Sequence, residues 1–258
     1  MKVVIPVAGL GSRMRPHTHA RPKPLLEVAG QPILDFIVNE SLQLKPSEII
    51  FVVGHKKEMI EQHVRETYPE TPVRFVEQEI ADGDGSALRL ALNPFEEDEE
   101  VFVIFGDTMV DFTYRELLQK KGDGDVLVLG MRVDQPQHYG ILELNEQQEV
   151  TGVEEKPKNP SSDMAIIGAY YFKSLLQVKT ILQRHYQQGK TIKGEYKIAQ
   201  VLQSCIKMKD VRIKAVEVKN WFDCGRPEAL LMANQYFLGK FCHGKTAMRG
   251  TSLIISPS

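Results

Sequence analysis

The sequence predicts an α/β protein: a doubly wound, mostly parallel, Rossmann-like sheet with a small antiparallel insertion. Short runs of β-branched residues alternate with helical patterns through the first half of the chain. These runs are almost wholly apolar, as expected of strands that helices cover on both faces. Beyond Met131, two more polar strand-like segments flank a turn, which is typical of an antiparallel hairpin.

The expected elements follow from these patterns in chain order. Runs of Val, Ile and Phe predict strands at 3–7, 49–53, 73–76, 101–105 and 126–131. Apolar residues three and four apart predict the intervening helices at 32–44, 57–68, 86–93 and 114–120. The second half adds a hairpin of 139–144 with 149–154, strands at 165–172 and 211–218, and helices at 173–188, 195–208 and 227–238. We therefore expect one domain over residues 1–240, followed by a tail, 241–258.

Composition argues against several classes of partner and site. The 258 residues are 42% hydrophobic and 26% charged, as in globular proteins with a substantial core. A formal charge of −2 provides no overall field for nucleic acid or membrane, so neither is an expected partner. Cys205, Cys224 and Cys242 form no CxxC pair, which argues against a zinc site and a disulfide framework. Because no signal-peptide or membrane-span pattern is present, we expect a cytoplasmic protein, and a homo-oligomer is compatible with the sequence.

The first predicted strand leads into a long loop, residues 9–31, that is rich in glycine and proline. Its start superficially suggests a dinucleotide-binding turn, but Met14 occupies the third glycine position and no P-loop pattern is present. Pro16, Pro22 and Pro24 prevent a helix directly after the glycines. Loops this long in compact domains are usually functional or disordered, and the prolines favour an ordered, functional loop.

The charges of this loop indicate an anion site. No carboxylate occurs in residues 1–26, whereas four cations lie close together: Arg13, Arg15, Arg21 and Lys23. Gly9 and Gly11 let the backbone approach a ligand and direct its amides inward. A triphosphate is the natural ligand for such a loop. The alternative is a basic surface loop that binds nothing.

A second glycine-rich segment, 78–87, follows the third predicted strand and leads into a helix that Ser86 is expected to cap. Gln78 carries both a donor and an acceptor, which suits the edge of a nucleobase. Gly83 allows the backbone to approach a flat ring. The same segment is also typical of an ordinary strand-to-helix turn.

Two aspartates at predicted strand ends indicate a metal site. Asp107 follows the strand at 101–105, and Asp223 follows the strand at 211–218. Ligands of open α/β sheets bind outside the carboxyl ends of the strands, so both acids lie at the expected edge. Two carboxylates with phosphate oxygens and water are the usual environment of Mg²⁺, which we predict here. Each aspartate alone is more often a turn residue or a helix cap.

The end of the predicted hairpin places an acid beside a base, in Glu155-Lys156-Pro157. Lys156 is suited to binding a monophosphate, and Glu155 to accepting hydrogen bonds from sugar hydroxyls. A solvated charged turn is the alternative. Gly140 and Gly168 occupy sheet positions, which indicates either a closely approaching ligand or a bulge.

In this order, the segments resemble the sugar-1-phosphate nucleotidylyltransferases, the family that makes dTDP-, UDP-, GDP- and ADP-sugars. The resemblance extends to about Leu238 and rests on five motifs: Gly9 to Pro16 with Arg21 to Leu26, Gln78 to Gly83, Gly106-Asp107, Glu155-Lys156-Pro157 and Trp221 to Gly225. It implies an enzyme, similar to glucose-1-phosphate thymidylyltransferases and mannose-1-phosphate guanylyltransferases, that joins a nucleoside triphosphate to a sugar 1-phosphate. The sugar phosphate would attack the α-phosphorus in line, and pyrophosphate would leave.

The resemblance also implies a role for each matching residue. The nucleotide would be bound by Gly9, Gly11, Ser12, Arg13, Lys23, Gln78 and Gly83, the sugar phosphate by Gly140, Glu155 and Lys156, and Mg²⁺ by Asp107 and Asp223. Arg13, Lys23 and Asp107 would carry catalysis, which requires positioning and charge neutralisation rather than a nucleophile. Gln78 favours thymidine or uridine over guanosine, whereas Pro24 departs from the thymidylyl pattern, so the base is not determined. The end of the tail, 251–258, resembles the first coil of a left-handed β-helix.

Two other functions compete with this one. A non-catalytic sugar-nucleotide-binding regulatory subunit would use the same scaffold, but would be expected to lack a metal carboxylate or the loop arginine, and both are present. A dinucleotide-dependent oxidoreductase disagrees with the proline-rich loop and the missing third glycine.

Overall fold

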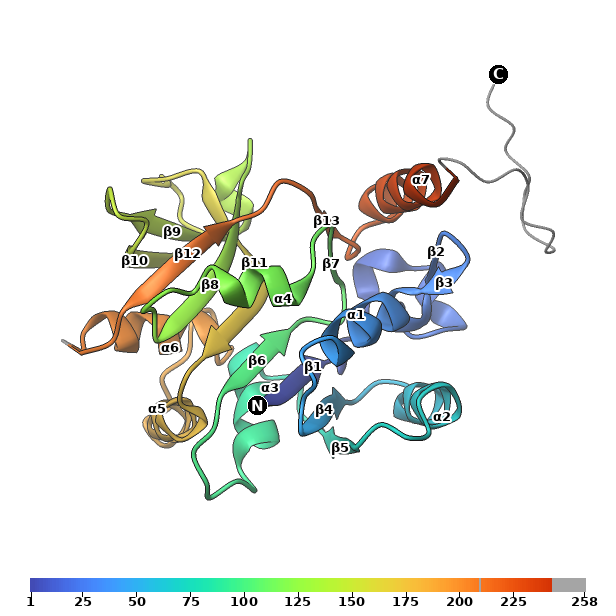
Figure 1. Ribbon diagram of the computed structural model, residues 1–258, viewed down its shortest axis with the longest axis horizontal. Helices are drawn as coiled ribbons and strands as arrows, with labels where there is room; N and C mark the ends of the chain where they lie inside the picture. Colours follow the sequence, from blue (N-terminus) through green and yellow to red (C-terminus); the bar gives the residue numbers. More distant parts are fainter. Residues whose placement is uncertain (209, 243–258) are drawn as a thin grey trace.

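The computed structural model describes residues 1–208 and 210–242. The predicted fold class is confirmed, because a central, mostly parallel sheet carries helices on both of its faces (Figure 1). Most of the predicted tail, 243–258, including the segment compared with a β-helix coil, lies outside the described residues. Within those residues, no helix combines the length and the apolar composition that a membrane crossing requires.

The main sheet of the described chain has nine strands: β1 (Lys2–Pro6), β4 (Glu48–Val53), β5 (Val73–Glu77), β6 (Val101–Ile104), β8 (Val126–Arg132), β9 (Gly140–Leu144), β10 (Val150–Glu155), β11 (Met164–Phe172) and β12 (Ile213–Glu217). The path runs β10-β9-β11-β6-β1-β4-β5, and β8 pairs with both β11 and β12. The neighbours β6, β1, β4 and β5 are parallel. The hairpin β9–β10 is the predicted insertion. The sequence did not reveal that β11 lies inside the sheet, antiparallel to β6 and β8.

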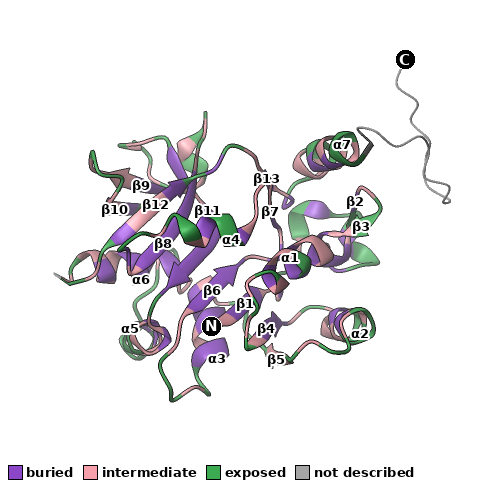
Figure 2. Ribbon diagram, viewed as in Figure 1, coloured by how far each residue is buried: buried purple, intermediate pink, exposed green. Residues whose placement is uncertain are grey.

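Two helical layers bury the sheet between them. One layer contains α1 (Ile33–Leu42), α2 (Lys57–Thr67), α4 (Tyr114–Gln119) and α7 (Pro227–Cys242), and the other contains α3 (Asp84–Leu92), α5 (Leu175–Gln187) and α6 (Ile198–Ile206). Successive strand residues point to opposite faces, so Val3 and Ile5 pack with the first layer and Val4 with the second. Figure 2 shows the strands as the buried centre of the molecule. Each buried Val or Ile contributes roughly 1.5–3 kcal/mol.

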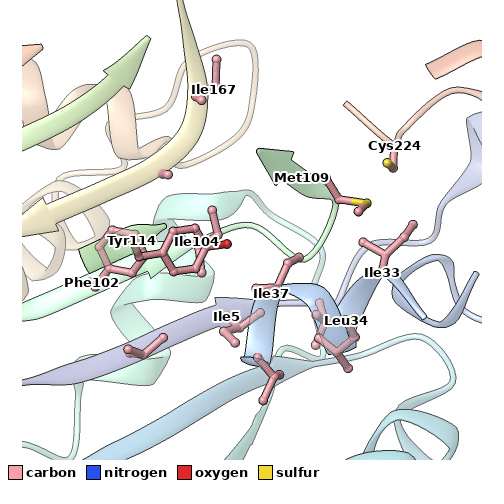
Figure 3. Packing of buried hydrophobic residues seen from close by; sticks show 14 of the residues in the cluster. Ile5, Ile33, Leu34, Ile37, Phe102, Ile104, Met109, Tyr114, Ile167 and Cys224 are labelled. Atoms are coloured by element: carbon pink, nitrogen blue, oxygen red, sulfur yellow. The ribbon is translucent and has the colours of Figure 1, made fainter. Parts of the chain in front are cut away.

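A separate ribbon of two short strands, β7 (Thr108–Val110) and β13 (Trp221–Asp223), was not predicted. The strands are antiparallel, with Asp223 opposite Thr108. Figure 3 shows Met109 of β7 and Cys224 in the packed cluster that also contains Ile33 of α1. Strands of three residues are too short to show a periodic pattern. The ribbon brings the segments that carry the two predicted metal ligands side by side.

The loop after β1 is ordered by short 3-10 turns. It contains η1 (Ser12–Met14), η2 (His17–His19), η3 (Lys23–Leu25) and the strand pair β2 (Glu27–Val28) and β3 (Gln31–Pro32). Met14 and Thr18 are buried, and Thr18 Oγ1 donates a hydrogen bond to the carbonyl of Gly11 at 2.9 Å. Gly11 has a φ of 61°, and a Cβ there would lie 2.9 Å from the Thr18 methyl group. The loop therefore closes on itself, as the prolines indicated.

Two local expectations are decided by the structure. Helix α3 begins at Asp84, after Gly83, so the prediction that Ser86 caps it is wrong. Gly83 adopts a φ of 120°, a conformation that starts the helix earlier and buries Ser86 within it. Gly168 has a φ of 75° and lies where the β11–β8 register shifts between Ile166 and Tyr170, which identifies it as a bulge residue.

Candidate active site

A pocket of about 250 Å³ lies beyond the carboxyl ends of β1, β5 and β6. This is the edge at which open α/β sheets bind ligands, as the sequence predicted. The predicted nucleotide residues in its wall are Gly9, Lys23, Gln78 and Gly83, together with Asp107. We call it the nucleotide pocket.

A second pocket of about 220 Å³ adjoins the first, and we call it the acceptor pocket. Its wall contains Arg13, Asp107, Gly140, Glu155, Lys156 and Asp223. Both pockets share Asp84, Phe105, Asp107 and Lys197, so they meet along one wall. The structure thus gathers most of the predicted residues, from both halves of the chain. The ligand assigned to each of them remains a prediction.

Gly225 is the centre of a cluster of charged side chains. A Cβ at this position would lie 2.7 Å from Asp223 Oδ1, 3.1 Å from Lys23 Nζ and 3.3 Å from Arg13 Nη2. Lys23 also forms an ion pair with Asp107, 84 residues away in sequence. A side chain at position 225 would displace this cluster. The sequence placed Gly225 in a motif but did not indicate this reason for a glycine.

The β7–β13 ribbon positions the two aspartates. The amide of Cys224 donates to the carbonyl of Asp107 at 3.1 Å, and the amide of Gly225 donates to Asp223 Oδ1 at 3.1 Å. Cys224 itself is buried, and burial, with a smaller effect of Asp107, raises the pKa of its thiol to about 12. A neutral thiol is a poor metal ligand and nucleophile.

The side chains at the ribbon fit a magnesium ion. Among residues 1–208 and 210–242, no three ligating His, Cys, Asp or Glu side chains come together. Asp107 and Asp223 line the same pocket and supply carboxylate oxygens, the donor type that Mg²⁺ prefers. An ion held by these two groups would need phosphate oxygens and water to complete its octahedron, as is usual for Mg²⁺ in nucleotide sites.

Gln78 is a buried residue of the nucleotide pocket wall. Its Nε2 donates hydrogen bonds to Asp82 Oδ1 at 3.2 Å and to the carbonyl of Gly83 at 3.0 Å. These bonds use both amide hydrogens within the turn and leave Oε1 as the acceptor. Gly83 also has a packing role that the sequence did not indicate, because a Cβ there would lie 2.2 Å from the carbonyl oxygen of Tyr196. The close packing of the backbone therefore requires a glycine at this position, in addition to any requirement of a ligand.

The segment 195–197, which the sequence did not single out, crosses the turn after β5. The amide of Tyr196 donates to the carbonyl of Asp82, and the amide of Gly85 donates to the carbonyl of Tyr196, both at 2.8 Å. This places Lys197 Nζ 3.6 Å from Asp84 Oδ2. The sequence signal that was missed is Gly83-Asp84-Gly85, because glycines on both sides of an acid indicate that another segment of backbone packs closely against this turn.

The acceptor pocket is closed by the end of β10. A Cβ at Gly140 would lie 3.1 Å from Glu155 Oε2, so the glycine makes room for this carboxylate. Lys156 has a φ of 48°, which is uncommon for a lysine, and its amide donates to the carbonyl of Tyr139 at 3.0 Å. Its ammonium is half exposed and lies 4.0 Å from Glu155. Such backbone strain concentrates at ligand-binding positions.

Two predicted nucleotide residues lie apart from both pockets. Gly11 packs beneath Thr18, and Ser12 is exposed at the start of η1. Neither is part of a pocket wall. Gly11 supports the loop that carries Arg13 and Lys23, whereas the structure indicates no contact for Ser12 with the other site residues.

The chain is similar to known proteins over nearly its whole length. A family model described as nucleotidyl transferase matches residues 2–239. The chain is 32% identical over 241 residues to the bifunctional protein GlmU of Methanocaldococcus jannaschii, covering 93% of this chain and 55% of that protein. It is 29% identical over 233 residues to the UTP–glucose-1-phosphate uridylyltransferase AglF of Haloferax volcanii, covering 88% of this chain and 93% of that protein. The chain thus spans about half the length of the first relative and nearly all of the second.

A solved structure shares the fold. It is the crystal structure of a putative glucose-1-phosphate thymidylyltransferase from Bacillus anthracis in complex with a sucrose. The TM-score is 0.76 at 24% sequence identity, and the match covers 92% of this chain and 95% of that one.

Proposed function

The chain belongs to the nucleotidyl transferase family, and from this premise we propose that it joins a nucleoside triphosphate to a sugar 1-phosphate. The observation that carries the proposal is the cluster at Gly225. Arg13, Lys23 and Asp223 converge there, beside Asp107 and at the meeting of two pockets. Bringing two phosphate-bearing substrates together is a problem of charge neutralisation, for which such a cluster is suited.

In the proposed reaction, an ionised oxygen of the sugar phosphate attacks the α-phosphorus of the triphosphate. The bond from the α-phosphorus to the bridging oxygen breaks, and pyrophosphate leaves with the electron pair. No general base is required, because the attacking phosphate is already ionised near neutral pH. Arg13 neutralises the phosphates, and Lys23 exchanges its ion pair with Asp107 for a phosphate oxygen. Lys156 holds the acceptor phosphate.

Asp107 and Asp223 would hold Mg²⁺ in this reaction. The ion would supply positive charge to the phosphate oxygens of the nucleotide. The same retained acids and the loop arginine favour catalysis over a purely regulatory, sugar-nucleotide-binding role.

We propose a pyrimidine nucleotide and glucose 1-phosphate as the substrates. Since the amide hydrogens of Gln78 are used within its turn, its Oε1 suits the N3–H donor of uracil or thymine. AglF, which matches over most of its length, is by its name a UTP–glucose-1-phosphate uridylyltransferase.

The test is pyrophosphate release with UTP, dTTP, GTP or ATP and glucose 1-phosphate in the presence of Mg²⁺. Asp107→Asn and Arg13→Ala are expected to lower turnover by about 10²-fold or more, because each removes one charge from the cluster. Arg21→Ala is the matched control. Arg21 lies in the same loop but is exposed, pairs with Glu27 at 3.1 Å and belongs to neither pocket. Its loss should change turnover by less than about threefold.

Circular dichroism would verify that the variants are folded. Wild-type turnover in folded Asp107→Asn or Arg13→Ala would refute the catalytic assignment. Tight calorimetric binding of UTP by a wild-type protein that releases no pyrophosphate would favour the regulatory alternative.

A further inference from the structure

Asp84 and Lys197 form an ion pair in the wall shared by the nucleotide and acceptor pockets. Neither residue belongs to the motifs that led to the proposed function. Asp84 is the first residue of α3, and Lys197 directly precedes α6. The pair therefore depends on the packing of two helices whose sequences are far apart.

The fold holds this pair tightly. Asp84 Oδ1 accepts a hydrogen bond from the amide of Ile198 at 2.6 Å, while its Oδ2 faces Lys197 Nζ at 3.6 Å. Lys197 also forms an ion pair with Glu195. The backbone beneath is closely packed, because a Cβ at Gly85 would lie 3.0 Å from Lys197 backbone atoms. The two charged groups are thus preorganised rather than free to move with solvent.

The pair shares the wall of the acceptor pocket with residues of both kinds. Arg13 and Asp223 of the charged cluster line this pocket, and so do Asp84, Lys197, Glu155 and the buried Tyr170. Burial raises the pKa of Asp84, with Lys197 acting against this rise and Glu155 adding to it. These effects place Asp84, Lys197 and Glu155 in one electrostatic environment.

The charges of this environment select the kind of group that it can bind. The Lys197 ammonium faces the carboxylates of Asp84 and Glu195, and Glu155, which lies 4.0 Å from Lys156 Nζ, adds a third carboxylate. A second anion would be repelled by these carboxylates, so we assign the sugar phosphate to the cations Arg13 and Lys156. A hydroxyl group both donates and accepts hydrogen bonds, and can therefore bridge a carboxylate and an ammonium 3.6 Å apart.

We propose that Asp84 and Lys197 recognise a hydroxyl group of the sugar, in addition to the contacts expected of Glu155 and Lys156. Asp84 accepts a hydrogen bond from the hydroxyl group, and Lys197 donates a hydrogen bond to the hydroxyl oxygen. The inference rests on the proposed function and makes the pair a determinant of sugar specificity. The site then requires an unsubstituted, neutral hydroxyl at one position of the sugar ring.

The first test separates sugar binding from nucleotide binding. Asp84→Asn and Lys197→Met are expected to raise the KM for glucose 1-phosphate by about tenfold or more, and to change the KM for UTP by less than about threefold. Where the wild-type protein uses dTTP better, dTTP replaces UTP. Lys207→Met is the matched control, since Lys207 is exposed at the other end of α6 and belongs to neither pocket. Asp84→Asn keeps an oxygen for the Ile198 amide, so folding is expected to survive.

An unchanged KM for glucose 1-phosphate in both variants would overturn the inference. A rise in the KM for UTP alone would also overturn it, because the pair would then serve the nucleotide. The wild-type protein could also release no pyrophosphate with glucose 1-phosphate. That result would reject the proposed function for this sugar, and with it the inference.

The second test identifies the hydroxyl. The 2-, 3-, 4- and 6-deoxy analogues of glucose 1-phosphate are compared in wild-type protein and in Asp84→Asn. The analogue that lacks the recognised hydroxyl should lower the kcat/KM of the wild-type protein by about tenfold. The kcat/KM of Asp84→Asn should be no lower with this analogue than with glucose 1-phosphate. If the role of Asp84 is purely structural, the loss in kcat/KM caused by Asp84→Asn should multiply with the loss caused by each of the four analogues. That result would contradict direct recognition.

Discussion

Gly225 shows how the absence of a side chain organises the candidate active site. Three charged groups from different segments surround the position that its Cβ would occupy, with Asp223 Oδ1 as the nearest at 2.7 Å. The same principle applies at Gly140, where the missing side chain admits Glu155. Glycine is needed at both positions for space and not for an unusual φ, since neither has a positive φ.

Gly225→Ala is therefore expected to reduce kcat by about tenfold, because its Cβ would push the Asp223 carboxylate by a few tenths of an ångström from its place in the cluster. Steady-state kinetics with UTP and glucose 1-phosphate would measure it, alongside a thermal unfolding curve. Gly239→Ala is the control. No atom lies within 4 Å of the Cβ that it would add on α7, so it should keep full activity and gain about 1 kcal/mol of helix stability. Equal kcat values in the two variants would show that the packing at Gly225 is not critical.

The loop between β1 and α1 acts as an ordered element although it has little regular structure. Its 3-10 turns are joined by the hydrogen bond from Thr18 to the carbonyl of Gly11, and this bond lies beneath the segment that carries Arg13. The sequence indicated an ordered loop through its prolines. It did not identify Thr18, because a single buried threonine leaves no periodic pattern.

Thr18→Val tests this hydrogen bond, since valine keeps the shape of the side chain and removes the hydroxyl. The kcat/KM for UTP is expected to fall by about tenfold as the loop loosens, whereas the free energy of unfolding should decrease by only about 1 kcal/mol. Thr180→Val also removes a threonine hydrogen bond, from Oγ1 to the carbonyl of Leu176 at 2.8 Å within α5, and Thr180 lies in neither pocket wall. If both variants lower kcat/KM equally, the loop bond has no special role.

Across the molecule, one helical layer contains a buried histidine that links stability to pH. His185 of α5 is 7% exposed, and its Nε2 lies 2.9 Å from Ser204 Oγ of α6. Burial, with smaller effects of Lys190 and Arg184, lowers the pKa of His185 below its usual value. The unfolded chain therefore takes up a proton as the pH falls through about 6.5, while the folded chain resists it. The unfolded state then binds more protons, so stability decreases below this pH.

Urea unfolding between pH 7.5 and 5.5 would measure this effect. The midpoint should fall with pH in the wild-type protein and fall less in His185→Gln, which has no ionisable group in this range. His55→Gln, at an exposed position, serves as the control and should keep the wild-type slope. A wild-type slope in His185→Gln would mean that other titrating groups, the remaining histidines included, account for the whole dependence.

Local patterns were sufficient for most of the elements. The strand at 49–53 and the helix at 57–68 agree with β4 and α2 to within about one residue, because hydrophobic periodicity is a local property. The β7–β13 ribbon and the antiparallel place of β11 were not predictable in this way. Strand pairing depends on contacts between distant segments, which a pattern within one segment does not contain.

From residue types and their order alone, the chain could be understood as a doubly wound α/β protein with a cationic loop and acids at strand ends. Its folding in three dimensions was needed to bring Arg13, Lys23 and Asp223 around Gly225, and to pair Asp84 with Lys197. The physical reason is that backbone preferences and periodicity act over a few neighbouring residues. Charged groups from distant segments meet only where packing of the whole core brings their backbones together.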